Sequence, residues 1–210
     1  MGWFDFSRTP AAPVVETLDI PLFPLRAVLF PGSVLPLKIF EQRYLDMAAA
    51  CLKESRPFGI CLIANGEETG SAAEPHAVGT LADITSWEME QLGILLITAR
   101  GGRRFRILDS RVGDDQLLRA RVEVINDNGP AALPAERRRL LPLLRRVIGD
   151  LAPERVPLPH DYDDAEWVGY RICDILPVQN LAKQKLLELE DPLARLEILE
   201  KFLDQRKLLG

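Results

Sequence analysis

The stretch from residue 18 to 47 constrains the fold most, because four prolines divide its apolar residues into short runs. These prolines are Pro21, Pro24, Pro31 and Pro36. Each proline fixes φ and removes a backbone donor, so the stretch can form neither a long helix nor a continuous central strand. We therefore predict a strand, a crossing segment fixed by proline, a second strand and then a helix.

Pro31 and Gly32 mark the sharpest break in this stretch. Proline suits the first central position of a type II turn, and glycine can take the positive φ that follows it. The flanking runs carry too many large apolar groups for a surface loop. We expect these side chains in the core: Leu22, Phe23, Leu25, Val28, Leu29, Phe30, Leu35, Leu37, Ile39 and Phe40.

Residues 40–52 predict an amphipathic helix, because their apolar side chains recur at helical spacing. Short apolar runs at 58–64, 78–87 and 112–124 predict strands. The segment 93–108 predicts two further strands, joined by a hairpin turn at Gly101-Gly102.

The composition changes after Asn126, and the apolar spacing beyond it is near 3.6 residues. Pro142 predicts either a kink or the first turn of a helix. Asp163 with Glu166 predicts a capping box at the start of a helix, and Asp191 predicts the cap of the last helix.

These patterns predict four parts of the chain. They are an N-terminal arm (1–17) containing Trp3, Phe4 and Phe6, a β domain with one helix (18–125), a linker (126–134) and a helical domain (135–210).

Two segments resemble the N-terminal domain of the ATP-dependent protease Lon. The first resemblance rests on Phe23-Pro24-Leu25-Arg26, Phe30-Pro31-Gly32, Pro36-Leu37 and 41–44, continued by Gly79-Thr80 and 102–107. The second rests on Leu176-Pro177, 183–188, Asp191, Arg195, Leu196 and Leu199. The resemblance implies an α+β protein in which a PUA-like pseudo-β-barrel domain precedes a C-terminal α-helical bundle.

The chemistry of full-length Lon is absent from this sequence. In Lon, the similar region precedes an ATPase with a phosphate-binding glycine loop and a protease with a serine-lysine dyad. No GxxxxGK[ST], GxSxG, serine-x-x-lysine or HExxH pattern occurs here. We therefore expect a protein that is not an enzyme and uses no cofactor.

The residues that could carry other chemistry have simpler structural interpretations. The cysteines lack metal-like spacing and the histidines stand in loop-like segments, so we interpret the cysteines as buried apolar groups. An acidic cluster could be read as a metal site, but charge at a helix N-terminus explains it, and we expect no metal. These residues are Cys51, Cys61, Cys173, His76, His160, Asp161, Asp163 and Asp164.

The composition is 47% hydrophobic and 27% charged, with a net charge of −5. It indicates a globular chain, and no apolar run reaches the roughly 20 residues that span a bilayer. We expect a cytoplasmic protein. Residues 100–146 carry 12 arginines and 6 acidic residues. This basic segment indicates an anionic partner or neutralisation by the acidic segments of the same chain, and we favour neutralisation.

The leading functional hypothesis is a recognition module resembling the Lon substrate-binding domain. It would bind unfolded or partly folded polypeptide, or a partner protein such as a separate protease, in an apolar groove between the β domain and the helices. The candidate wall residues are Phe23, Leu25, Phe30, Trp87 and Met89. Trp87 and Met89 lie near a predicted hairpin tip, where they either remain exposed or fold back onto the domain.

The alternative hypothesis is an RNA-binding PUA-like module. Its contact candidates are Arg103, Arg104 and Arg106, with Phe105 between them as a stacking group. Period-2 alternation favours a simpler interpretation, in which the arginines face outward and Phe105 faces inward. The sequence leaves the oligomeric state open.

Overall fold

The computed structural model describes residues 15–126, 129 and 131–209. The strands are β1 (Thr17–Leu25), β2 (Val34–Ile39), β3 (Phe58–Asn65), β4 (Glu74–Pro75), β5 (Val78–Gln91), β6 (Ile94–Val112) and β7 (Leu118–Val124). The helices are α1 (Gln42–Glu54), α2 (Leu141–Asp150), α3 (Ala165–Ile175), α4 (Asn180–Glu188) and α5 (Pro192–Gln205), with 3-10 turns η1 (Ala135–Leu140) and η2 (Pro153–Arg155). Trp3, Phe4 and Phe6 of the predicted arm lie outside the described residues.

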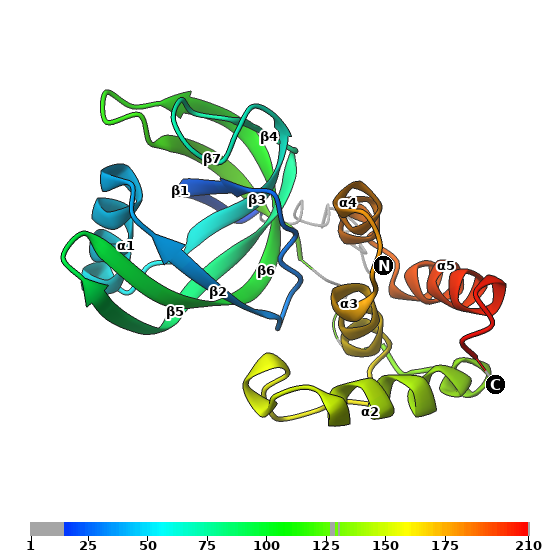
Figure 1. Cartoon of the computed structure of the whole chain (residues 1–210). Coiled ribbons are helices and arrows are strands. Elements are labelled where there is room, and N and C mark those ends of the chain that lie inside the picture. Colours follow the sequence, from blue (N-terminus) through cyan, green and yellow to red (C-terminus); the bar gives the residue numbers. More distant parts are fainter. Residues whose placement is uncertain (1–14, 127–128, 130, 210) are drawn as a thin grey trace, which may run out of the picture.

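The strands form one curled sheet. Its order is β1-β7-β6-β5-β3-β4, and β2 pairs with β6 beside this path. β1 also pairs with β3, so the sheet bends until these two strands meet. Figure 1 shows α1 on the side of the sheet opposite to α2–α5. This is the predicted α+β organisation with a C-terminal helical region.

The prolines of β1 lie inside a single strand, contrary to the prediction that they interrupt it. Residues Thr17–Pro21 pair with β7, whereas Leu22–Leu25 pair with β3. Each half of β1 therefore has a partner on one side only. Proline is tolerated at such edge positions because the missing N–H is not needed there.

The predicted type II turn is confirmed. The Ser33 amide donates to the Phe30 carbonyl at 3.0 Å, and Gly32 has a φ of +73°. The predicted core residues around the turn are buried or half-buried except Phe40, which follows the last residue of β2 and is exposed.

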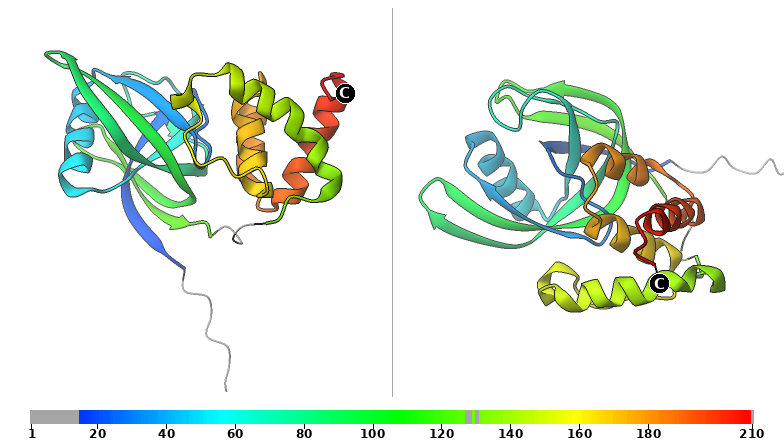
Figure 2. Two further views of the ribbon diagram at one scale, coloured as in Figure 1. Left: turned by 90° about the horizontal axis from the view of Figure 1, so that it is seen from below. Right: turned by 45° about the vertical axis from the view of Figure 1, so that its right-hand side comes forward.

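The crossing between β1 and β2 is where the helices dock. Phe30 is fully buried in the apolar core of the helices, with its ring centroid 6.0 Å from that of Tyr170. The Arg171 guanidinium donates to the Pro31 carbonyl, and the Asn180 amide donates to the Arg26 carbonyl. In Figure 2, α3 and α4 lie between the sheet and α5 in both views.

Gly101 and Gly102 do not form the predicted hairpin turn. β6 continues through them, neither residue has a positive φ, and the turn between β5 and β6 lies at Leu92-Gly93. Between Thr80 and Ala82 the pairing register shifts, which places a β-bulge at Gly102 and Arg103. A Cβ on Gly101 would lie 2.3 Å from the Phe30 carbonyl oxygen, so close approach of the crossing requires this glycine.

Two of the C-terminal helices, α3 and α5, begin with side-chain caps. Asp164, not the predicted Asp163, caps α3 by accepting from the amides of Glu166 and Trp167. Asp191 caps α5 as predicted, and Pro142 lies in the first turn of α2.

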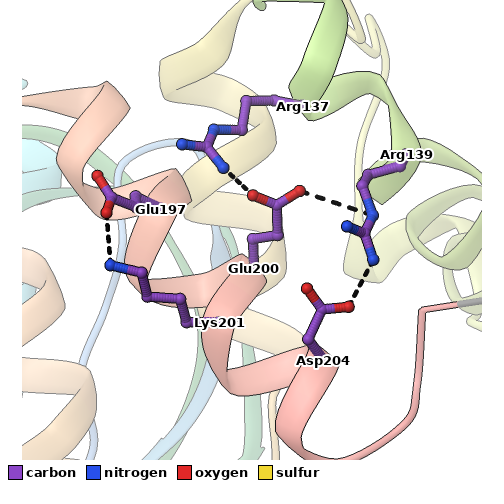
Figure 3. Close-up of polar contacts among 6 residues, drawn as sticks. All are labelled: Arg137, Arg139, Glu197, Glu200, Lys201 and Asp204. Atoms are coloured by element: carbon purple, nitrogen blue, oxygen red, sulfur yellow. Dashed lines mark hydrogen bonds and ion pairs between the residues drawn. The ribbon is translucent and has the colours of Figure 1, made fainter.

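The arginines that precede α2 pair with acids of α5. Glu200 pairs with Arg137 and with Arg139, and Arg139 also pairs with Asp204 (Figure 3). Arg138 pairs with Asp163. These pairs support neutralisation of the basic segment inside the protein.

We predict that Gly101→Ala destabilises the protein by about 1–3 kcal/mol, because its methyl group would overlap the Phe30 carbonyl. Gly102→Ala is the matched control. Its Cβ would meet the Leu81 carbonyl oxygen at an ordinary 3.5 Å. Urea unfolding followed by circular dichroism measures both. Equal stability of the two variants would contradict the close-approach argument.

Candidate functional site

The candidate site is an apolar hollow between α1 and the hairpin of β5 and β6. Its volume is about 380 Å³. Trp87 and Met89 lie on its hairpin side and are 59% and 54% exposed. The lining residues are Leu45, Asp46, Ala49, Leu52, Trp87, Met89, Gly93 and Leu95.

Two regular spacings build this hollow. In β5, Trp87 and Met89 are two residues apart and therefore point to the same face of the strand. In α1, Leu45, Ala49 and Leu52 are spaced i, i+4 and i+7, which places them on one stripe of the helix. This stripe lies beside the buried stripe that anchors α1 to the sheet, which contains Tyr44, Met47, Ala48 and Cys51.

The predicted apolar face of this helix includes Leu52 but not Leu45 and Ala49, although their spacing carries the signal for a second stripe. The apolar residues of α1 cover more of the helix surface than packing on one sheet requires. Because only one apolar face was assigned to the helix, the second stripe was not recognised as a binding surface.

Three of the predicted wall residues do not reach the surface. Phe23, Leu25 and Phe30 are 6%, 7% and 0% exposed, so they belong to the core rather than to a groove wall. The hollow also lies elsewhere than predicted, since its lining comes from α1, β5, β6 and the turn between these strands. The helices fill the predicted location, where Phe30 packs against Tyr170.

Three acidic residues lie in or near the hollow. Asp46 is one of the lining residues, and Glu88 is exposed on β5 between Trp87 and Met89. Glu90 forms an ion pair with Lys38 of β2 at 2.7 Å. Trp87 and Met89 alternate with Glu88 and Glu90, so the acids lie on the face of β5 away from the hollow.

A second hollow of about 760 Å³ lies between α1 and the strands β1, β6 and β7. It is lined by four arginines and four aspartates together with apolar residues. Equal numbers of opposite charges give it no preference for a ligand of one sign. Arg119 and Asp115 pair within it at 2.6 Å, and this pairing lowers the pKa of the Asp115 carboxyl to about 2.

The three RNA-contact candidates all bind other groups of the same chain. Arg103 pairs with Glu16 at 2.6 Å, and Arg106 pairs with Glu190 at 3.3 Å. Arg104 is 1% exposed, contrary to the expectation of an outward side chain. It lies on the face opposite to the buried Phe105, but α4 and the segment that follows it cover that face.

Arg104 binds the end of a helix. Its Nη1 donates to the carbonyls of Leu187 and Leu189 at 2.7 and 2.8 Å. Carbonyls in the last turn of a helix lack intrahelical partners and carry partial negative charge, so a guanidinium stabilises them. Arg195 of α5 donates to the Leu186 and Leu189 carbonyls.

The predicted interpretation of the cysteines as buried groups agrees with their positions. Cys51, Cys61 and Cys173 are free and buried. Burial raises the pKa of the Cys173 thiol to about 12 and also raises the pKa of Cys51 and of Cys61. Their thiols therefore stay protonated at neutral pH.

Asp163 forms the ion pair with Arg138, and Asp164 caps α3. Within the residues that the structure describes, no group of three His, Cys, Asp or Glu side chains could hold a metal ion. None of the described helices has the length and apolar character to cross a bilayer.

Comparisons with known proteins agree with this fold. A family model described as the ATP-dependent protease La (LON) substrate-binding domain matches residues 19–205. The Lon protease of Cytophaga hutchinsonii is 26% identical over 195 residues, which are 89% of this chain and 24% of the protease. Protein cereblon of Gallus gallus is 29% identical over 110 residues, which are 50% of this chain and 24% of cereblon. The chain thus spans about a quarter of the length of these curated relatives.

Solved structures extend the likeness to the fold. The Lon N-terminal domain protein from Xanthomonas campestris has a TM-score of 0.74 at 34% identity and covers 88% of this chain and 98% of its own. The N-terminal domain of the Mycobacterium avium complex Lon protease has a TM-score of 0.62 at 22% identity and covers 89% and 97%. The second likeness shows the fold alone.

These observations first define a class, an α+β domain with the Lon N-terminal fold and an apolar hollow on its surface. Within this class, the chain belongs to the family of Lon substrate-binding domains, as the sequence predicted. The part matched is the substrate-binding domain and not a catalytic domain. The division of the chain into four parts stays a prediction.

We predict that Arg104→Met lowers the free energy of unfolding by about 2–4 kcal/mol, because it removes a charged donor from two carbonyls at the end of α4. Arg106→Met is the control, since its ion pair with Glu190 is exposed and worth at most about 1 kcal/mol. Urea unfolding measures both changes. A loss at Arg104 no larger than that at Arg106 would refute the bridging role.

Proposed function

We propose that this protein binds polypeptides that expose apolar side chains, and that the binding site is the hollow between α1 and the β5–β6 hairpin. The observation that carries the proposal is the pair Trp87 and Met89, which are more than half exposed beside an apolar stripe of α1. Apolar side chains gathered in this way on a surface mark interaction sites. Membership of a substrate-binding family supports the same role.

The chemistry of the hollow suits varied ligands. Methionine is flexible and polarizable, so it adapts to apolar groups of different shape. Tryptophan offers a large rigid surface that loses little conformational entropy on binding. Together they favour a site that recognises exposed apolar character rather than one particular sequence.

We further propose that recognition occurs without peptide hydrolysis. The chain carries neither a nucleotide-binding glycine loop nor the sequence context of a catalytic serine. A bound polypeptide would therefore leave this protein unchanged. A separate protease is one partner that could act on it. RNA binding is not proposed, because Arg104 is buried and both Arg103 and Arg106 pair with acids of the same chain.

We predict that Trp87→Ala weakens binding of a reduced, carboxymethylated model protein by about tenfold or more. The substitution removes the largest apolar surface that the hollow offers, and a tenfold loss corresponds to about 1.4 kcal/mol. Fluorescence anisotropy of the labelled model protein gives the dissociation constant. Stability of the variant is checked by urea unfolding.

Phe40→Ala is the matched control. Phe40 is 57% exposed and does not line the hollow, so its removal takes away a similar apolar surface at another place. It should leave the dissociation constant within about twofold of the original. Equal losses in the two variants, or no saturable binding by the unsubstituted protein, would rule out the proposed site.

A further inference from the structure

The strand that carries Trp87 and Met89 has a free backbone edge. β5 pairs with β6 along its whole length, from Val78 to Gln91. On its other side, β5 pairs with β3 only from Thr80 to Ala82. From Asp83 to Gln91, no other strand of the described chain pairs with this side of β5.

An open edge of this length is unusual in a folded protein. Its unpaired amide and carbonyl groups can accept a strand from another chain, so natural proteins usually shorten or cover such edges. Here all residues from 85 to 91 are exposed. The edge runs beside the apolar hollow, which brings backbone donors and acceptors next to an apolar surface.

We propose that the occupant of the site is an extended polypeptide segment that adds to β5 as a further strand. This inference rests on the proposed function and specifies how the polypeptide binds. Backbone hydrogen bonds to residues 83–91 would supply affinity that does not depend on sequence, and side chains would supply the preference.

The two faces of β5 specify the preferred segment. Alternate side chains of the added strand point to the same face as Trp87 and Met89 and enter the hollow lined by Leu45 and Ala49. The side chains between them point to the face of Glu88 and Glu90. Residues 83–91 hold three acidic residues and no basic one, and of these acids Glu90 is paired with Lys38 whereas Glu88 is exposed. The matching segment therefore alternates apolar and basic residues.

The closing experiment uses a synthetic peptide, acetyl-KVKVKVKV-amide, and two N-methylated forms of it. Methylation of every valine amide removes the donors on one edge of the extended peptide, and methylation of every lysine amide removes those on the other edge. Side chains and charge are unchanged. Labelled peptides are titrated with the full chain and followed by fluorescence anisotropy.

Strand addition uses only one edge of the peptide. We expect one methylated peptide to bind at least about tenfold more weakly than the parent, because several hydrogen bonds are lost, and the other to bind within about threefold. Glu88→Lys should weaken the parent peptide by about threefold or more at low salt. Glu136→Lys, the same charge change on η1, should not.

The remaining outcomes separate this inference from the proposed function. Equal binding of all three peptides that still depends on Trp87 would overturn strand addition and leave the proposed site intact. Absence of peptide binding, with the unfolded model protein still bound through Trp87, would also overturn strand addition. If the chain sediments as a dimer that the parent peptide dissociates, a second copy of the chain is the occupant and the proposal is overturned.

Discussion

The helices are held on the β domain by hydrogen bonds to backbone carbonyls of the crossing between β1 and β2. The Pro31 carbonyl accepts from Arg171 of α3, and the Arg26 carbonyl accepts from Asn180 of α4. Proline shapes this crossing, and the helices supply donors for these two carbonyls. Arg104 adds a contact in the opposite direction, from β6 to the end of α4. The sheet and the helices are therefore joined by hydrogen bonds, and breaking these bonds costs free energy.

This junction determines where a ligand can bind. Because the helices cover one face of the sheet, Phe30 and Arg104 are buried and cannot contact a ligand. Trp87 and Met89 remain exposed beside the hollow between α1 and the β5–β6 hairpin. Figure 1 shows α1 on the side of the sheet away from α2–α5. The position of the site thus follows from the packing that stabilises the fold. Two arginines of the basic segment belong to that packing, since Arg104 binds the end of α4 and Arg106 pairs with Glu190.

The sequence predicted features that depend on neighbouring residues. The Pro31-Gly32 turn and the Asp191 cap follow from local patterns. The hairpin position of Trp87 and Met89 left open whether they are exposed, and the structure shows that they are. Features set by distant contacts were missed. Gly101 appeared to mark a turn, but it accommodates a carbonyl some 70 residues earlier in the chain, and no local pattern contains that contact. Phe23, Leu25 and Phe30 were assigned both to the core and to a groove, and only three-dimensional packing decides between these roles.

Amide hydrogen exchange, measured with and without saturating unfolded model protein, tests the central claim that the open edge and its hollow form the binding surface. The account predicts slower exchange for the amides of β5 from residue 83 to 91. The amides of α1, which lines the hollow with side chains only, should slow to a lesser extent. Exchange at the α4 end that Arg104 binds should not change, because this region stays sealed by the junction. Slower exchange confined to α2–α5, with β5 unchanged, would contradict the account.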